Sequence, residues 1–319
     1  MNQSWIEVRV ARRTPVAENI VALELVAVND DWLPTFSAGA HVDLELPNGL
    51  VRQYSLCSAP ARRDRYEVGV LLDPTSRGGS RCVHEQLQEG VVLRISPPRN
   101  LFALKPARHS ILLAGGIGIT PLLCMAEHLS TEGASFELHY CSRSPARTAF
   151  VERLRASAFA NQVHFHFDEG DAALRVDLNT VLAEPASDRH LYVCGPRGFM
   201  DHVIETATEL GWPEGTIHFE SFSGAVVECA TDGCFDVQLA STGQVVLVKA
   251  DQSVAEALLA AGVEVPLSCE QGICGTCVMR VLEGEVEHRD MALSDEERVD
   301  RFTPCCSRAK AGRLVIDHF

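Results

Sequence analysis

The chain has 319 residues, of which 46% are hydrophobic and 22% charged, and its 43 acidic and 28 basic side chains give a formal net charge of −15. This length predicts two or three domains of roughly 100–150 residues each. The acidic balance speaks against nucleic acid or an anionic membrane as a partner, because both require clustered Lys and Arg. An ordinary acidic surface and a docking surface for a basic protein both fit it.

The sequence contains no run of about 18 apolar residues that would predict a transmembrane helix. Its first residues, MNQSWIEVRVARRT, lack the basic and then apolar layout of a signal peptide. We therefore expect a cytoplasmic protein that does not bind membranes. In such a protein the twelve cysteines are interpreted as metal ligands in some cases and buried thiols in others.

Residues 1–106 consist of short alternating runs such as IEVRVARRT, HVDLELP and YEVGVLL, separated by Gly, Pro, Asn and Asp. Regular short strands of this kind predict an antiparallel β-barrel, with one helix over residues 80–88. Within it, RQYSLCS places Arg52, Tyr54 and Ser55 together, where a flavin ring and phosphate could bind. A second segment before the helix predicts an anion site at Gly78, Gly79 and Ser80. Taken alone, RQYSLCS fits an exposed strand equally well.

Residues 107–224 alternate apolar strands with helices, which predicts a parallel sheet covered on both faces. The run ILLAGGIGITPLLCMA reads as a strand, a glycine turn and a helix over residues 121–129. Its glycines would let the backbone approach a pyrophosphate, with Thr120 as N-cap and Pro121 at the first helical position. The turn glycines are Gly115, Gly116 and Gly118. Tight packing alone is the alternative explanation for such a turn.

A second turn, YVCGPRGFM, ends another strand of this region at Cys194, Gly195 and Pro196. The carboxyl ends of parallel strands share one edge of a sheet, where ligands bind in α/β folds. The two turns together therefore predict a dinucleotide site. Residues 225–234 are interpreted as a linker, and residues 235–319 as a third domain with two alternating strands, a helix, a cysteine-rich loop and a closing strand.

The cysteine-rich loop, PLSCEQGICGTC, contains the strongest motif in the chain. Cys269, Cys274 and Cys277 have the C-x₄-C-x₂-C spacing of plant-type [2Fe–2S] proteins. Such a cluster requires a fourth thiolate, and PCCSRA offers Cys305 and Cys306.

Two other interpretations fit the residues of this loop less well. A structural zinc site usually pairs two C-x₂-C knuckles, and only one is present. A dithiol redox pair would leave Cys269 without a role. Gly272 and Gly275 suit a loop whose backbone must approach cluster sulfurs closely, so the cluster is favoured.

In this order, RQYSL, GGIGITP, CGP, CEQGICGTC and PCCSRA resemble the phthalate dioxygenase reductase family, over essentially the whole chain. These are FMN, NADH and [2Fe–2S] reductase components of Rieske aromatic-ring oxygenases, and they include the vanillate O-demethylase reductases. The resemblance implies a flavin-binding β-barrel, a ferredoxin-reductase-like NAD domain and a plant-type ferredoxin domain of the β-grasp type. It implies FMN rather than FAD, in keeping with the short segment after RQYSL.

The resemblance also implies roles for individual residues. Flavin contacts would come from Arg52, Tyr54 and Ser55, phosphate contacts from Gly78, Gly79 and Ser80, NAD contacts from the GGIGITP turn, and nicotinamide contacts from Cys194, Gly195 and Pro196. Phe222, in HFESF, would lie near the flavin, and Arg143 near the adenosine ribose. NADH is preferred, although an arginine at that place is compatible with NADPH. The family pattern makes Cys305 the fourth cluster ligand and leaves Cys306 at a variable position.

We therefore predict a monomeric reductase that moves electrons from NADH through FMN and [2Fe–2S] to a Rieske aromatic-ring dioxygenase or O-demethylase. Hydride transfer requires no acid–base residue, so none is assigned, and most of the twelve histidines are read as ordinary surface or core residues. One alternative is a reductase for a carnitine-type or haem-dependent oxygenase. The other is an electron carrier without NADH turnover.

Overall fold

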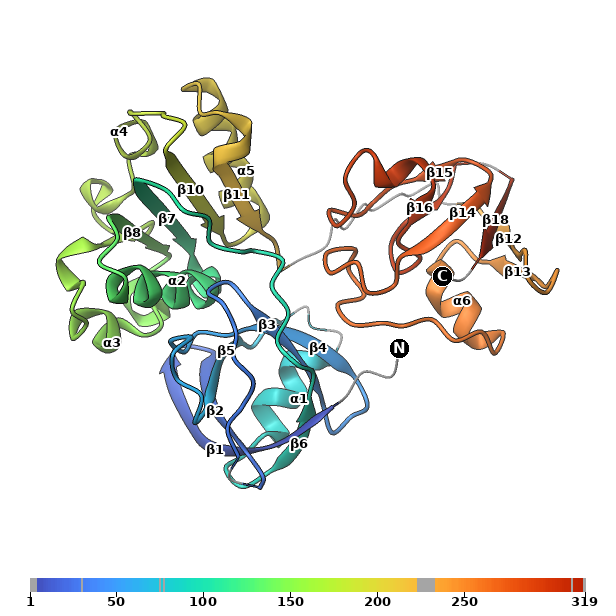
Figure 1. The fold of residues 1–319 in the computed structure, drawn as a ribbon, viewed down its shortest axis with the longest axis horizontal. Coiled ribbons are helices and arrows are strands. Elements are labelled where there is room, and N and C mark those ends of the chain that lie inside the picture. The colour runs from blue at the N-terminus through green and yellow to red at the C-terminus, as the bar shows by residue number, and fades with distance from the viewer. Residues whose placement is uncertain are drawn as a thin grey trace. The chain divides into compact units, whose positions relative to one another are not determined.

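The computed structural model describes residues 5–29, 31–74, 76, 78–222, 233–310 and 312–317. The chain divides into two compact units, Met1–Ser221 and Phe222–Phe319. The first, coloured blue to yellow in Figure 1, contains an antiparallel and a parallel sheet, and the second, orange to red, contains a mixed sheet. Among the described helices, none has both the length and the apolar character needed to cross a bilayer.

The antiparallel sheet has six strands in the order β4-β3-β6-β1-β2-β5. Their bounds are β1 Ile6–Ala17, β2 Ile20–Ala27, β3 His41–Glu45, β4 Val51–Ser55, β5 Tyr66–Leu71 and β6 Val92–Ile95. An antiparallel bridge between Leu56 and Val68 joins the two outer strands, so the sheet closes into a barrel. Helix α1, Gly79–Gln86, adds Cys82 and Val83 to the barrel core.

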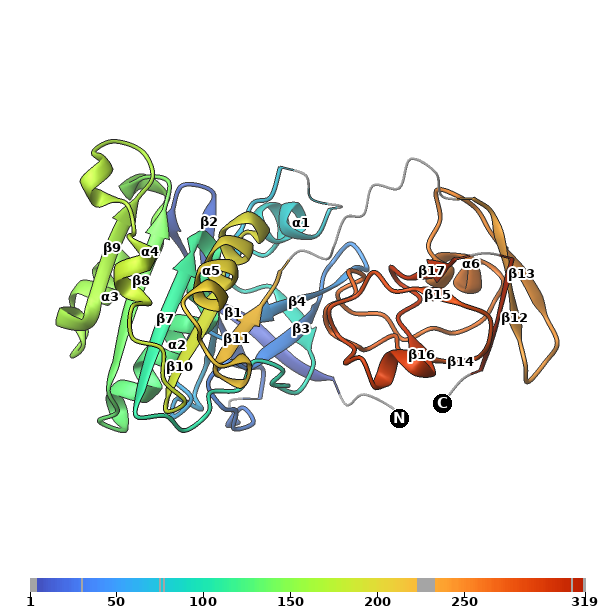
Figure 2. The same ribbon diagram turned by 90° about the horizontal axis from the view of Figure 1, so that it is seen from above.

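The parallel sheet has five strands in the order β11-β10-β7-β8-β9. These are β7 His109–Gly115, β8 Phe136–Ser142, β9 Val163–Phe167, β10 Arg189–Cys194 and β11 Ile217–Glu220. Helices α2, Ile119–Thr131, and α3, Val151–Arg155, pack on one face, and α4, Leu178–Val181, and α5, Arg197–Glu209, on the other (Figure 2). Burial on both faces explains why the central strand β7 is apolar at nearly every position.

The barrel and the parallel sheet share one hydrophobic core. Ile20, Ala22 and Cys57 of the barrel pack in the same cluster as residues of α2 and β8. Arg153 of α3 strengthens the contact, because it forms an ion pair with Glu67 of β5 and donates a hydrogen bond of 2.9 Å to the carbonyl oxygen of Cys57. This common core explains why the two sheets belong to a single unit.

The second unit is built on a five-stranded mixed sheet in the order β13-β12-β18-β14-β16. These strands are β12 Phe235–Leu239, β13 Val245–Val248, β14 Met279–Glu283, β16 Arg301–Phe302 and β18 Arg313–Asp317, with β15 Val286–Glu287 and β17 Arg308–Ala309 pairing separately. Helix α6, Val254–Ala260, begins with a capping box between Ser253 and Glu256 and packs on the sheet. The three fold classes predicted from the sequence, barrel, parallel α/β sheet and α+β ferredoxin domain, are thus confirmed.

The domain boundaries at residues 106 and 224 stay predictions, and most of the expected linker, residues 225–234, lies outside the described residues. One local prediction was wrong. Helix α2 begins at Ile119, with Gly118 as its N-cap, so Thr120 is not the cap and Pro121 is the third helical residue. The glycine turn itself forms a 3₁₀ turn, Gly116–Gly118, that runs directly into the helix. Proline is tolerated there because the first-turn N–H groups have no partner within the helix.

Candidate functional site

The two glycine turns of the first unit meet at the carboxyl ends of β7 and β10. A Cβ atom added to Gly118 would lie 2.1 Å from the carbonyl oxygen of Cys194 and 2.7 Å from the backbone nitrogen of Gly195. A Cβ atom on Gly195 would in turn lie 2.9 Å from the Cα atom of Gly115. The backbones of the two strand ends therefore touch, the Phe199 ring packs against Gly115 and Gly195, and no side chain fits at Gly118.

Of the remaining residues of the first turn, Gly116 borders open space, whereas Thr120 and Pro121 are buried. Gly116 has a φ of +55°, and a Cβ there would have open space around it. Thr120 is buried, and its hydroxyl donates a hydrogen bond of 3.1 Å to the carbonyl oxygen of Ile117. A Cβ on Gly69 of β5 would lie 2.8 Å from Cγ2 of Thr120, so the turn also packs against the barrel. Pro121 is buried beside it.

In the barrel, the predicted flavin segment lies next to the predicted anion site. Arg52 and Tyr54 are half-buried on β4, and burial raises the pKa of the Tyr54 hydroxyl. A Cβ on Gly79 would lie 2.8 Å from Cγ of Arg52, so the arginine side chain packs directly over the start of α1. Gly78 caps that helix with a φ of +97°, and the hydroxyl of Ser80 accepts a hydrogen bond from the backbone N–H of Asp73. The fold thus brings Arg52 to a helix N-terminus suited to a phosphate.

A half-buried carboxyl group that the sequence did not reveal joins these two regions. Glu220, at the end of β11, accepts a hydrogen bond of 3.3 Å from the hydroxyl of Ser55 on β4. Burial raises the pKa of Glu220 to about 7, and the Ser55 hydrogen bond opposes that rise. Burial and then the nearby Glu220 raise the pKa of the Cys194 thiol. Ser55, Cys194 and Glu220 therefore gather where the barrel meets the carboxyl edge of the parallel sheet.

The other two predicted residues lie at the ends of strands. Arg143 is exposed directly after β8, and its carbonyl oxygen accepts a hydrogen bond of 2.9 Å from the backbone N–H of Glu169. The N–H of Asp168, after β9, donates to the carbonyl oxygen of Ser142 over 3.1 Å. Phe222 follows β11 with 37% of its surface exposed. Its place near a flavin stays a prediction.

In the second unit, the four predicted cluster cysteines converge from two segments. The thiols of Cys269 and Cys274 share a hydrogen bond, which raises the pKa of Cys269 and lowers that of Cys274. A hydrogen bond between the Cys305 and Cys277 thiols likewise raises the pKa of Cys305. Every cysteine that the structure describes is a free thiol. The sulfurs thus lie in two close pairs, as the ligands of a two-iron cluster do.

The backbone around these sulfurs also fits a cluster. The N–H of Gln271 donates to Sγ of Cys269 over 3.4 Å, and the N–H of Gly272 donates to Sγ of Cys305 over 3.2 Å. Gly272 has a φ of +72°, and a Cβ there would lie 2.3 Å from Sγ of Cys306. Donors aimed at the sulfurs stabilise thiolate ligands, and the glycine permits the close approach. Residues of the chain therefore fit the [2Fe–2S] group that the motif implies.

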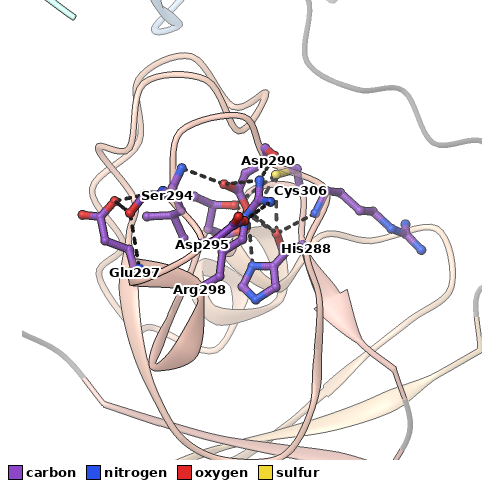
Figure 3. Close-up of polar contacts among 11 residues, drawn as sticks. His288, Asp290, Ser294, Asp295, Glu297, Arg298 and Cys306 are labelled. Carbon is purple, nitrogen blue, oxygen red and sulfur yellow. Dashed lines mark hydrogen bonds and ion pairs between the residues drawn. The ribbon is translucent and has the colours of Figure 1, made fainter. Parts of the chain in front are cut away.

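A buried carboxylate supports this loop (Figure 3). The side chain of Asp290 is fully buried, and its Oδ2 accepts a hydrogen bond of 2.9 Å from the N–H of Leu293. Its Oδ1 lies 3.4 Å from both the Ser307 hydroxyl and Nδ1 of His288. Arg298 lies 3.7 Å from Oδ2 and donates a hydrogen bond of 2.8 Å to the carbonyl oxygen of Asp290. The carboxylate is thus surrounded by donors.

Asp290 and the residue that follows it connect the two cysteine segments. The N–H of Met291, the residue after Asp290, donates to the carbonyl oxygen of Gly272 over 2.9 Å, inside the loop that carries three of the cysteines. Ser307, which donates to Asp290, follows the Cys305–Cys306 segment directly. This network could not be predicted from local patterns, because Asp290 is separated from both segments along the chain.

Comparisons with known proteins agree with the fold and the site. The 2Fe-2S iron-sulfur cluster binding domain model matches residues 237–310, and the model of the N-terminal domain of dimethylamine monooxygenase subunit DmmA-like proteins matches residues 93–217. A vanillate O-demethylase oxidoreductase of a Pseudomonas species is 53% identical over 98% of this chain and 99% of its own length. A second protein of that name, from Pseudomonas putida, is 55% identical over the same shares of the two chains.

Solved structures give the same result. Phthalate dioxygenase reductase, described as a modular structure for electron transfer from pyridine nucleotides to [2Fe–2S], superposes with a TM-score of 0.80 at 39% identity over 98% of both chains. An intact type IV self-sufficient cytochrome P450 monooxygenase matches 98% of this chain with 41% of its own, with a TM-score of 0.82 and 38% identity. With such identity over nearly its whole length, the chain belongs to the phthalate dioxygenase reductase family, the flavin and iron–sulfur oxidoreductases that serve oxygenase partners.

Proposed function

We propose that this chain transfers a hydride from NADH to FMN and delivers single electrons through its [2Fe–2S] cluster to a Rieske-type oxygenase that demethylates an aromatic ether such as vanillate. The main support is the meeting of Ser55, Cys194 and Glu220, since it joins the predicted flavin segment of the barrel to the predicted nicotinamide turn. The substrate class is suggested by two relatives that are more than half identical and are named for vanillate.

The bound flavin would accept two electrons as a hydride and release them singly, and the cluster would carry them onward. The chain's own residues would position these groups. Arg52 and the N-terminus of α1 would hold a terminal phosphate, which suits FMN. The touching backbones of Gly118 and Cys194 would bring a nicotinamide to the buried side of the site, away from water.

An anaerobic titration of the purified protein with NADH tests this function. We expect flavin and iron–sulfur absorbance that bleaches in stages, and FMN as the flavin released by denaturation. When a vanillate-type Rieske oxygenase is then added, the reduced protein should transfer electrons to it one at a time and reduce its Rieske centre. A colourless zinc protein, or one that binds NADH without bleaching, would contradict the proposal and favour an electron carrier without NADH turnover.

A haem-dependent monooxygenase is the second candidate acceptor, because 98% of this chain matches 41% of a self-sufficient cytochrome P450 monooxygenase. The same reduced protein distinguishes the two acceptors. Electron transfer to a Rieske centre, with none to a haem monooxygenase, supports the first candidate, and the reverse result supports the second.

Glu220→Gln is expected to remove a pH dependence from flavin reduction. In the parent protein the rate of flavin reduction should fall roughly tenfold as the pH rises through about 7. An ionised Glu220 would repel the negative charge that a hydride brings to the flavin, and it would also hold the Ser55 hydroxyl. The variant carries no charge there, so its rate should stay at the low-pH value. Stopped-flow absorbance between pH 6 and 8.5 measures both profiles.

Glu214→Gln, at an exposed carboxylate outside the site, is the matched control and should retain the parent profile. Stability gives an independent check. Because the pKa of Glu220 is raised in the folded protein, its contribution to stability is lost as the pH rises from its ordinary value of 4.5 to about 7. Glu220→Gln should therefore melt at a higher temperature than the parent at pH 8, and a lower melting temperature would contradict this assignment.

The coenzyme preference is expected to depend on acidic residues beside Arg143. Asp168 and Glu169 follow β9 and hydrogen-bond through their backbones to Ser142 and Arg143. Their carboxylates should repel a 2′-phosphate, which explains a preference for NADH despite the arginine. The double substitution Asp168→Asn and Glu169→Gln should raise the NADPH to NADH ratio of kcat/KM by roughly three- to tenfold. Ferricyanide reduction with each coenzyme measures it, and an unchanged ratio would place the ribose elsewhere.

A further inference from the structure

One face of the parallel sheet carries a group of metal-ligating side chains outside the cofactor sites. Glu137 and His139 lie on β8 and His164 lies on the edge strand β9, and one ligand atom from each falls within 4.8 Å of the others. His139 and His164 are direct partners in the strand register. Glu137 precedes His139 by two residues, so both side chains lie on the same face of the sheet.

His139 is the central member of this group. Only 6% of its surface is exposed, and its Nδ1 forms a hydrogen bond of 3.0 Å with Nε2 of His166. Its Nε2 is buried 3.1 Å from Oε2 of Glu137 and has no hydrogen-bond partner among the described residues. A buried ring nitrogen without such a partner is uncommon. A bound cation would satisfy it, and the contact with His166 would fix the ring as outer-shell partners of metal-ligating histidines do.

Neighbouring basic side chains reduce the affinity of this group for a cation, but they do not block access to it. Arg189 lies 3.9 Å from Oε1 of Glu137, but it forms a closer ion pair, of 2.9 Å, with Glu184. His109 also faces Oε1, at 3.4 Å. The other oxygen, Oε2, faces His139, and His164 is exposed to solvent. A cation can therefore enter from the His164 side.

We propose that Glu137, His139 and His164 bind a divalent transition-metal ion, with Zn²⁺ as the reference ligand. Two imidazoles and one carboxylate are a donor set that zinc uses, with water in the fourth position. The ion would join β9 to β8 on the unit that is proposed to bind NADH, so its expected effect is to hold the edge strand in place.

Zinc titration of the untagged holoenzyme by isothermal calorimetry tests the site, with thermal melting as a second readout. We expect one zinc per chain and a rise in melting temperature for the parent. His164→Gln, at an exposed position that should not impair folding, is expected to weaken binding by at least about tenfold and abolish the rise. His202→Gln, at an exposed histidine of α5 outside the group, is the matched control and should behave as the parent.

Zinc could also displace iron from the cluster cysteines, so the iron–sulfur absorbance is recorded throughout the titration. Binding that bleaches the cluster and is the same in His164→Gln would overturn the proposal, as would a parent protein without zinc-dependent heat or stabilisation. Glu137→Gln provides a second variant, since it removes a ligand charge while retaining the side chain's volume. Parent-like zinc affinity in that variant would also contradict the site.

Discussion

Cys305→Ser is expected to yield a protein that retains its flavin but has lost the [2Fe–2S] absorbance. The Sγ of Cys305 accepts the N–H of Gly272 and pairs with the Cys277 thiol, so the substitution removes one of four converging sulfurs. Without the cluster, NADH should still reduce ferricyanide through the flavin. Reduction of cytochrome c, a single-electron acceptor, should fall to background. Visible spectra, iron content and the two assays measure the result.

Cys306→Ser is the matched control at the neighbouring residue. The Cys306 sulfur lies 3.2 Å from the Thr303 hydroxyl and packs where a side chain at Gly272 would be. Serine is smaller than cysteine and can retain that contact, so this variant should keep its iron and its cytochrome c activity. If Cys306→Ser lost the cluster while Cys305→Ser kept it, the ligand assignment would be reversed.

Gly118→Ala is expected to impair NADH use strongly. The added carbon would lie 2.1 Å from the carbonyl oxygen of Cys194, and only a separation of the β7 and β10 strand ends could relieve the clash. Overpacking of this kind costs about 1–3 kcal/mol of stability. A displacement of about 1 Å at the reacting groups can lower kcat/KM for NADH by about 100-fold.

Gly215→Ala is the control for a methyl group added elsewhere in this unit. Gly215 precedes β11 at the opposite edge of the sheet, and a Cβ there would contact nothing within 4 Å. Its melting temperature and NADH kinetics should match the parent's. Ordinary NADH kinetics in folded Gly118→Ala would show that the contact between the two turns does not position the nicotinamide.

The features that the sequence predicted depend on local patterns. Each of these patterns extends over only a few residues: the cysteine spacing from Cys269 to Cys277, the glycine turn from Gly115 to Gly118 and the alternating barrel strands. Local patterns are less informative about where a helix begins. Helix α2 starts at Ile119 because the glycines already form a 3₁₀ turn, which the preference of Thr120 for a cap did not reveal.

The features that the sequence did not predict depend on burial by distant segments. Glu220 and Ser55 are 165 positions apart, and only the packing of the barrel against the parallel sheet makes their contact and raises the pKa of Glu220. An acidic residue that ends an apolar strand at the carboxyl edge was the available signal. The pairing of His139 with His164 depends on strand register, which a single sequence does not contain, so the sequence did not predict this group.

The network around Asp290 has a consequence for how the second unit fails on heating. The backbone of Met291 holds the loop of Cys269, Cys274 and Cys277, while the buried carboxylate of the preceding Asp290 holds Ser307, next to the segment of Cys305. Opening of the Cys305 segment would take the Ser307 hydroxyl away from that buried charge, and a shift of Asp290 would pull on the other loop through Met291, so neither segment should open alone. Release of iron and loss of tertiary structure should then occur as one cooperative transition. The loss of visible absorbance on heating would therefore report directly on the unfolding of this unit.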